Sequence, residues 1–214
     1  MLDEIDLLAL NYLTWIHENR YSKIVYFNRL LEGEQLHFRD GKIIKRYNCH
    51  LGKIEGWKYT YHLDGKIHMA QQYKNDKYHG VKKTYFPSGI LQSETYFKNG
   101  DFHGQQKYYG SGGELLELFY YIRNHKRGAY LKYDRNGCLL NYAFYCNDDQ
   151  PIYDIYWDSN GKLLTYNLHN NPSIIWYEDG RIVNHTNTDV DLLASQCQAI
   201  YTRYSKSTNV NLEI

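Results

Sequence analysis

The sequence predicts a mainly β protein, an elongated single-layer antiparallel sheet of about seven stacked β-hairpins with a short helix at each end. Three observations support this fold class: glycines that recur at a fixed interval, turn segments typical of hairpins, and an unusual composition. The chain has 24 tyrosines and only 3 prolines in 214 residues. Aromatic side chains fit a pleated, half-buried surface and proline interrupts strand pairing, so this composition favours extended strands.

Two series of glycines define a repeat of 24 residues. The turn glycines are Gly41, Gly65, Gly89, Gly113, Gly137 and Gly161. A second series lies nine residues before a turn glycine, at Gly56, Gly80, Gly104 and Gly128. A constant interval of this length is typical of a stacked array in which each repeat is one supersecondary unit. We interpret both series as structural.

Each repeat has the pattern of a hairpin. An aromatic residue precedes the turn glycine by four positions, at Tyr61, Tyr85, Tyr109, Tyr133 and Trp157. The turn segments, such as HLDGK and DRNGC, contain Asp, Asn and Gly, which accept positive φ or bond their own backbone. Because a single hairpin is marginally stable in water, each unit has to bury its apolar face against its neighbours. The array is predicted over residues 21–184.

The N-terminal segment, residues 1–20, is predicted as a helical cap. Apolar side chains recur there at helical spacing, at Ile5, Leu8, Tyr12 and Ile16. Acidic residues in the first turn suit the helix dipole. A helix over the first hairpin would cover the open edge of the sheet, which is the ordinary way to prevent edge-to-edge aggregation.

The C-terminal segment contains a second predicted helix, over residues 185–204. Thr188 and Asp191 have the spacing of a capping box, and the apolar residues that follow share one helical face, at Val190, Leu193, Cys197 and Ile200. Covering a sheet edge is the main interpretation, and a specific docking helix is the alternative. Residues 205–214 are predicted to be a flexible tail.

The balance of charge gives no reason to expect a nucleic-acid partner. The chain has 25 Lys and Arg against 24 Asp and Glu, a formal net charge of +1, so it creates no global field for a polyanion. The four cysteines lack paired spacing and are expected to be free thiols. No secretory signal or long apolar span is recognisable. A cytoplasmic protein is therefore expected.

No pattern of catalytic, cofactor-binding or metal-binding residues is evident. His79 and His103 occupy equivalent repeat positions and would lie about 10 Å apart, too far to share one metal ion. A metal site formed by His37, His50, His62 and His68, which fall around the first two hairpins, is a minor alternative. The glycines of the segment GSGGE precede a strand, whereas a phosphate site needs a following helix. We therefore predict no enzyme activity, no cofactor and no metal.

Residues 78–109 resemble MORN repeats, in particular the variant form of bacterial YwqK-family antitoxins. The resemblance rests on the pairs His79-Gly80 and His103-Gly104, on Tyr85 and Tyr109, and on the NG dipeptide before the second pair. It covers roughly residues 33–183 and departs from the pattern at Arg127-Gly128 and beyond. Similar arrays occur in eukaryotes and in large DNA viruses. The resemblance implies a stacked hairpin fold and a protein-binding or lipid-associated scaffold.

The candidate binding residues are the repeated aromatic and basic side chains Tyr85, Tyr109, Tyr133, Trp157, Lys83 and Lys107. Cross-strand stacking within the sheet is their simpler explanation. Adjacent rings, such as Tyr108 with Tyr109 and those of residues 119–121, point to opposite faces of a strand, so one of each pair is expected to be exposed. Exposed tyrosine and tryptophan are favoured anchors of protein interfaces.

We therefore predict a non-catalytic scaffold that binds a protein, with the antitoxin or immunity partner of a toxin as one possibility. Basic residues lie among the aromatic ones, including Lys58, Lys82, Lys132 and Arg135. Aromatic and basic side chains together also suit anionic phospholipid headgroups. Peripheral membrane binding and a structural role in a larger assembly, such as a virion, are the alternatives. The oligomeric state is left open.

Overall fold

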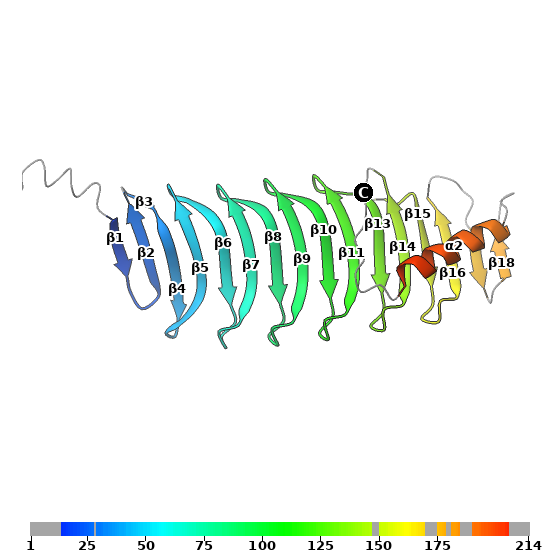
Figure 1. Cartoon of the computed structure of the whole chain (residues 1–214), viewed down its shortest axis with the longest axis horizontal. Helices are drawn as coiled ribbons and strands as arrows, with labels where there is room; N and C mark the ends of the chain where they lie inside the picture. Colours follow the sequence, from blue (N-terminus) through cyan, green and yellow to red (C-terminus); the bar gives the residue numbers. More distant parts are fainter. Residues whose placement is uncertain are drawn as a thin grey trace, which may run out of the picture. The chain divides into compact units, whose positions relative to one another are not determined.

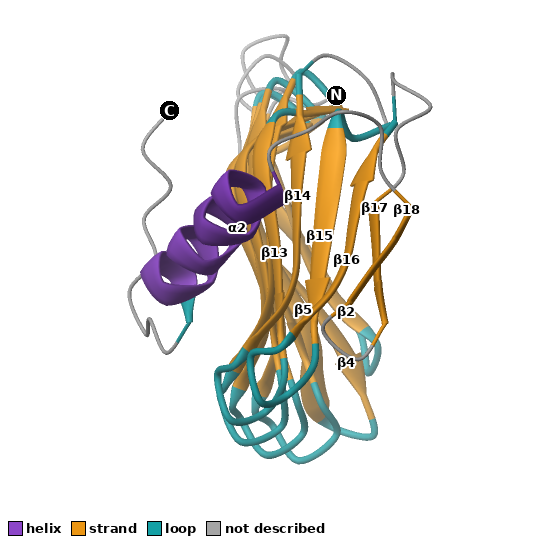
Figure 2. Ribbon diagram, turned by 90° about the vertical axis from the view of Figure 1, so that its right-hand side faces the viewer, coloured by secondary structure: helices purple, strands orange, loops and turns teal. Residues whose placement is uncertain are grey.

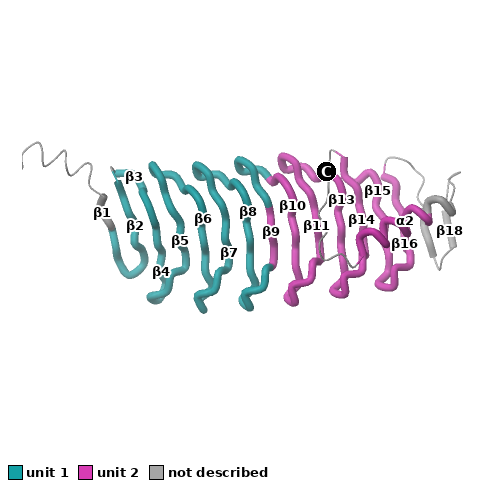
Figure 3. The backbone as a smooth tube through the Cα atoms, viewed as in Figure 1, with its two compact units in different colours: residues 1–91, 96–101 teal, residues 92–95, 102–214 magenta. Residues whose placement is uncertain are grey.

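The computed structural model describes residues 14–27, 29–146, 150–169, 175–178, 181–184 and 190–205. Contacts divide the chain into two compact units (Figure 3). The first comprises residues 1–91 and 96–101, and the second comprises residues 92–95 and 102–214. Strand β9 (Leu91–Lys98) contributes residues to both units.

The first unit consists of antiparallel strands that follow one another along the chain (Figure 1). They are β1 (Thr14–Glu18), β2 (Ser22–Phe27), β3 (Leu30–Leu31), β4 (Gly33–Arg39), β5 (Lys42–His50), β6 (Lys53–Tyr61), β7 (Ile67–Lys74) and β8 (Lys77–Tyr85). Strand β2 pairs with β1, β3 and β4, and from β4 to β8 each strand pairs with the next.

The second unit repeats this arrangement and adds a helix. Its strands are β10 (Asp101–Tyr109), β11 (Leu115–Ile122), β12 (His125–Lys126), β13 (Gly128–Tyr133), β14 (Leu139–Tyr145), β15 (Tyr153–Trp157), β16 (Leu163–Leu168), β17 (Ile175–Glu178) and β18 (Arg181–Asn184). The helix is α2 (Val190–Tyr204). Strand β11 pairs with both β12 and β13, and every pairing is antiparallel. The prediction of a mainly β sheet of successive hairpins is confirmed.

The hairpin turns have the same geometry in successive repeats. In the turn after β6, the Gly65 amide donates to the His62 carbonyl at 2.9 Å, and the His62 amide donates to the Lys66 carbonyl at 2.8 Å. The turn after β13 repeats both bonds, and there the Asp134 carboxylate also accepts from the amides of Asn136 and Cys138 at 2.8 Å. These are the local backbone bonds that Asp and Gly favour.

A second kind of turn joins one hairpin to the next and was not predicted. Between β7 and β8 it consists of Asn75 and Asp76, whose φ angles are 51° and 65°. Two consecutive residues with positive φ form a type I′ turn, which matches the twist of the strands. Four residues after Asp76, Gly80 (φ 94°) lies in a bulge, where the Gln72 side-chain oxygen accepts from the Val81 amide at 2.8 Å. A Cβ atom at Gly80 would collide with that side chain. The Gly80 series thus marks bulges.

The hydrophobic core of the second unit lies between its sheet and α2 (Figure 2). The core side chains are Leu118, Leu131, Tyr133, Leu139, Tyr142, Ile155, Trp157 and Cys197. Two aromatic contacts hold the helix: the ring of Tyr201 lies 5.7 Å from that of Trp157, and the ring of Tyr204 lies 5.7 Å from that of Tyr142. At the helix end, the Leu139 amide donates to the Ser205 hydroxyl at 3.2 Å. The predicted C-terminal helix is confirmed over residues 190–204.

The predicted N-terminal helix is wrong over residues 14–18. This segment forms β1, which pairs with β2 in continuous register from Thr14 opposite Phe27 to Glu18 opposite Lys23. Pairing with an adjacent strand outweighed the helical spacing of the apolar side chains, because short segments follow tertiary context over intrinsic preference. Residues 19 and 20 lie in the turn between β1 and β2 and are not helical either. Residues 1–13 of this predicted helix, Thr188 of the predicted cap and residues 206–214 of the predicted tail lie outside the described residues.

Candidate functional site

The second unit presents different side chains on the two faces of its sheet. Leu118 of β11 is fully buried in the core under α2. Since successive side chains of a strand point to opposite faces, its neighbours Glu117 and Phe119 lie on the face away from the helix. Gln106 of β10 is paired with Phe119 and therefore lies on that face too. Among the described residues, α2 covers one side of this sheet and leaves the other side uncovered.

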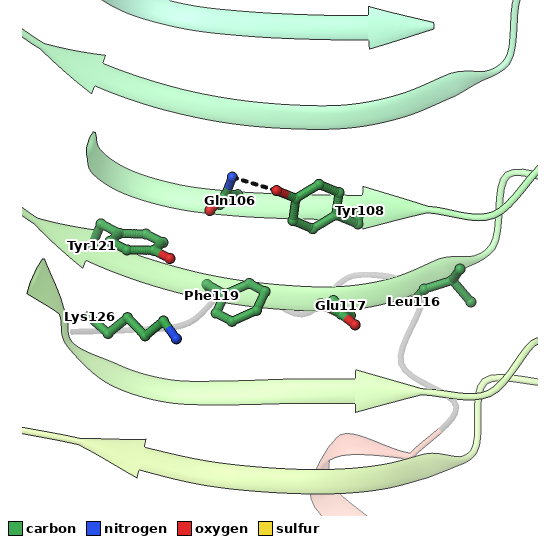
Figure 4. A pocket seen from close by; sticks show the side chains of 7 residues that line it. All are labelled: Gln106, Tyr108, Leu116, Glu117, Phe119, Tyr121 and Lys126. Carbon is green, nitrogen blue, oxygen red and sulfur yellow. Dashed lines mark hydrogen bonds between the residues drawn. The ribbon is translucent and has the colours of Figure 1, made fainter. Parts of the chain in front are cut away.

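An open hollow of about 440 Å³ lies on this second face (Figure 4). We call it the aromatic hollow. Side chains from β10, β11 and β12 line it: Gln106, Tyr108, Leu116, Glu117, Phe119, Tyr121 and Lys126. Tyr108 is 39% exposed, which makes it a prominent apolar group on the surface. The hollow is a shallow surface feature, so it suits a large partner better than an enclosed small molecule.

The rings of the aromatic hollow support one another around Phe119. The Phe119 ring centroid lies 4.5 Å from that of Tyr130, 6.4 Å from that of Tyr108 and 6.3 Å from that of Tyr121. Burial raises the pKa of the Tyr130 phenol, with a smaller contribution from the negative charge of Glu117. Phe119 therefore lies at the centre of a packed group of rings.

Polar groups at the rim of the hollow are positioned by the same rings. The Lys126 ammonium lies 5.4 Å from the Phe119 ring centroid and 5.3 Å from that of Tyr145, so it is fixed by two cation–π contacts. The Gln106 amide donates to the Tyr108 hydroxyl at 2.9 Å. An ammonium, an amide and the Glu117 carboxylate thus lie around the apolar rings of the hollow.

The structure does not bring the predicted binding residues together at one exposed site. Tyr133 is 4% exposed and Trp157 is 2% exposed, because both are packed beneath α2. Neither ring is therefore exposed in the structure, and their binding of a partner stays a prediction. In the same unit, Tyr109 and Lys107 are half-buried, and Lys107 is paired with Leu118, which places it on the helix side of the sheet.

In the first unit, the predicted binding residues Lys83 and Tyr85 are half-buried on β8. Lys83 is paired with Ala70 of β7, which is itself paired with Tyr59 of β6. Next to Tyr59 along β6, the rings of Trp57 and Tyr61 stack on it at 5.8 Å and 6.5 Å. These stacked pairs lie within one strand, whereas the simpler explanation of the repeated rings was stacking between strands.

Sequence reasoning identified part of the aromatic hollow and missed the rest. The adjacent rings Tyr108 and Tyr109 indicated that one of the pair would be exposed, and Tyr108 is. Gln106, Glu117 and Lys126 were not recognised, because no repeat signal marks them. Their positions depend on which strands lie side by side, and the sequence pattern does not give that register.

A buried polar cluster lies between β15 and the end of β16 and was also missed. Asp154 is only 6% exposed. Its carboxylate lies 2.6 Å from the His169 Nε2 atom and accepts from the Asn167 amide at 2.6 Å. Asn167 and Asp154 are cross-strand partners. Both carboxyl oxygens therefore have polar partners, and the cluster satisfies a buried polar side chain within the sheet.

The remaining predictions concern the cysteines, the histidines and membrane-spanning segments. The four cysteines are free thiols, as expected. His62 and His68 lie close together, with ring centroids 4.7 Å apart. The described part of the chain contains no group of three or more His, Cys, Asp or Glu side chains that could hold a metal ion. Within the same residues, no helix has the length and apolar character needed to cross a membrane.

Comparison with known proteins gives little information about this chain. No family model and no curated protein matches it. Among solved structures, it is similar to one described as "Crystal structure of accessory secretory protein 1,2 and 3 in Streptococcus pneumoniae". The match has 14% sequence identity and a TM-score of 0.19, and it covers 56% of this chain and 18% of that chain. The present chain thus spans less than a fifth of that protein, and so low a TM-score carries no argument about function.

Proposed function

We propose that this protein is a non-catalytic binding scaffold of stacked MORN-type hairpins, and that the aromatic hollow is the surface that holds a protein partner. The observation that supports this proposal is the packed cluster of rings around Phe119, open to solvent on the sheet face that α2 leaves uncovered. Tyrosine is enriched at the energetic centre of protein interfaces, because one rigid ring contributes a large contact area and a hydroxyl group.

The fixed geometry of the hollow favours binding. Side chains that are already ordered lose less conformational entropy when a partner arrives, which leaves more of the contact energy for affinity. Phe119 contacts three other rings, and Lys126 lies between Phe119 and Tyr145. A partner that inserts an apolar side chain against Phe119 and offers a carboxylate to Lys126 would complement this surface.

The resemblance to YwqK-family antitoxins makes a toxin the first protein partner to test. In that role, the scaffold would bind and block the toxin without performing chemistry itself. A structural component of a larger assembly would use an exposed aromatic surface in the same way. The identity of the bound protein distinguishes these two roles.

The test is affinity capture with the tagged protein from lysate of its native cells, followed by mass spectrometry and titration with the purified partner. Tyr108→Ala removes an exposed ring of the hollow, and Tyr21→Ala, at a position 59% exposed, removes a ring outside it. We expect one stoichiometric protein that binds the unchanged chain and Tyr21→Ala equally, and binds Tyr108→Ala about tenfold more weakly, the loss typical of an anchoring ring.

Two results would contradict the proposal. If Tyr108→Ala retains full affinity for the captured protein, the hollow is not the contact surface. If phospholipid and no protein is recovered, peripheral membrane binding is the better description. Matching thermal unfolding curves for the two tyrosine variants would show that the comparison is not affected by misfolding.

A further inference from the structure

The first unit carries a row of lysines on one sheet face, separate from the aromatic hollow. Tyr47 of β5 is paired with Lys58 of β6, Lys58 with Gln71 of β7, and Gln71 with Lys82 of β8. Cross-strand partners point to the same face, so Lys58 and Lys82 lie in one row with Gln71 between them. Gln71 is fully buried, whereas both lysines are half-buried. We call Lys58, Lys82 and the flanking Lys45 the lysine row.

The lysine row has a concentrated positive charge. Desolvation by burial lowers the pKa of Lys58, and the nearby charge of Lys45 lowers it further. The pKa of the neighbouring His37 is lowered by desolvation and then by the charges of Lys45 and Lys58. None of the three lysines forms an ion pair with a carboxylate among the described residues. The row therefore complements an anionic ligand.

Aromatic rings hold Lys58 in position. Its ammonium lies 5.6 Å from the ring centroid of Tyr47 and 5.4 Å from that of Tyr73. The ring of His37 stacks on the ring of Tyr47, with the two centroids 5.7 Å apart and an angle of 15° between the rings. Apolar ring surfaces thus alternate with positive charges, and the ligand is expected to contain both anionic and apolar groups.

The spacing of the row indicates which polymer fits it. Lys58 and Lys82 are separated by two strand spacings, or about 9.6 Å. In a polyproline II helix, every third residue returns to the same side after about 9.3 Å. In a β-strand, same-side residues recur every second position, after about 6.7 Å, which does not match. A polyproline II segment that crosses the strands would place residues i and i+3 over the two lysines.

We propose that the lysine row binds an acidic, proline-containing segment of a protein in the polyproline II conformation, with a carboxylate at every third residue. Its carboxylates contact Lys58 and Lys82, the residues between them pass over β7 beside Tyr73, and the residue that precedes the first carboxylate lies against Tyr47. Aromatic grooves are the usual receptors for this conformation, which is preformed and loses little entropy on binding. The inference concerns the first unit and stands independently of the aromatic hollow.

The test uses the full chain and two labelled peptides of identical composition. In the first, Glu occupies every third position and Pro fills the others; in the second, all the Glu residues are together at one end. Fluorescence anisotropy at low salt is expected to show at least tenfold tighter binding of the periodic peptide. Lys58→Gln and Lys82→Gln should each weaken that binding about fivefold. Lys53→Gln, which removes the same charge from an exposed position at the start of β6 outside the row, should leave it unchanged.

The remaining outcomes overturn the proposal. Equal binding of the two peptides would mean that only total charge is recognised, and absence of binding would exclude this ligand class. Binding to phosphatidylserine vesicles that depends on Lys58 and Lys82, without binding of the periodic peptide, would assign the row to a membrane. Circular dichroism melts of the three variants would identify any loss of binding caused by unfolding. Because Tyr108 takes no part, loss of the hollow's function would not alter these results.

Discussion

At the scale of single residues, burial sets the chemistry of the cysteine thiols. Cys197 of α2 is 1% exposed, and burial raises the pKa of its thiol from 9.0 to about 11. Burial likewise raises the pKa of Cys49. Cys146, in contrast, is exposed after β14. Because the thiolate is the reactive form, the two buried thiols should be inert and Cys146 should react with alkylating reagents.

The raised pKa of Cys197 predicts a loss of stability at alkaline pH. Between the ordinary thiol value of 9.0 and about 11, the unfolded chain releases the Cys197 proton and the folded chain retains it. The folded state then binds more protons, so the free energy of unfolding falls as pH rises, by about 1.4 kcal/mol for each unit of pKa difference. Urea unfolding from pH 8 to 11 would measure this fall.

Cys197→Ala is the matched control for that measurement. It removes the ionisable group and leaves the buried tyrosines, whose raised pKa values act in the same direction. The variant should be less stable at neutral pH because of the cavity, and its stability should fall less steeply above pH 9. Parallel slopes for the two proteins would mean that Cys197 ionises normally in the folded state.

At the scale of elements, one turn glycine lies against a helix while an equivalent turn glycine has open space around it. Gly65 and Gly161 occupy the same position in two hairpin turns, with φ angles of 89° and 83°. A Cβ atom at Gly65 would meet nothing within 4 Å, whereas one at Gly161 would lie 2.6 Å from the ring of Tyr201. The turn after β15 therefore packs closely against α2.

This difference predicts unequal effects of the same substitution. Gly65→Ala and Gly161→Ala should both destabilise by about 1 kcal/mol, because alanine disfavours positive φ. Gly161→Ala should cost more, since the Tyr201 ring has to move away from Trp157. Thermal unfolding would measure the difference, and tryptophan fluorescence should change for Gly161→Ala and stay constant for Gly65→Ala. Equal melting temperatures and spectra would show that Tyr201 does not pack on this turn.

At the scale of the whole molecule, the order of strands makes stability local. Within each unit a hairpin pairs mainly with its sequence neighbours, as in other repeat proteins, where stability is approximately a sum of repeat and nearest-neighbour terms. The core under α2 belongs entirely to the second unit. A substitution that destabilises that core should therefore promote unfolding of the second unit more than of the first.

Leu131→Ala tests this locality. Leu131 is fully buried in the core of the second unit, so its truncation should cost about 2 to 5 kcal/mol. Amide hydrogen exchange should accelerate in β13 and β14 and change little in β6 and β7 of the first unit. Uniform acceleration throughout the chain would indicate that both units unfold together. The backbone amides of β6 and β7 in the unchanged protein provide the reference.

The sequence by itself determined the hairpin repeat, because turn geometry depends on local residues. The positive φ of Gly65 and Gly161 and the backbone bonds across each turn follow from residues within a few positions of each other. The 24-residue interval and the C-terminal helix could be predicted for the same reason. The type I′ turns at Asn75 and Asp76 have a local origin as well, although sequence reasoning did not recognise them.

Tertiary structure alone decided which face of the sheet is available. Tyr109 and Tyr133 are equivalent in the repeat, yet Tyr109 is half-buried and Tyr133 is buried, because α2 packs over the later hairpin. Pairing with β2 likewise made residues 14–18 a strand in spite of their helical spacing. Periodicity specifies which side chains share a face, whereas long-range packing of a distant segment determines whether that face is covered or remains open to a partner.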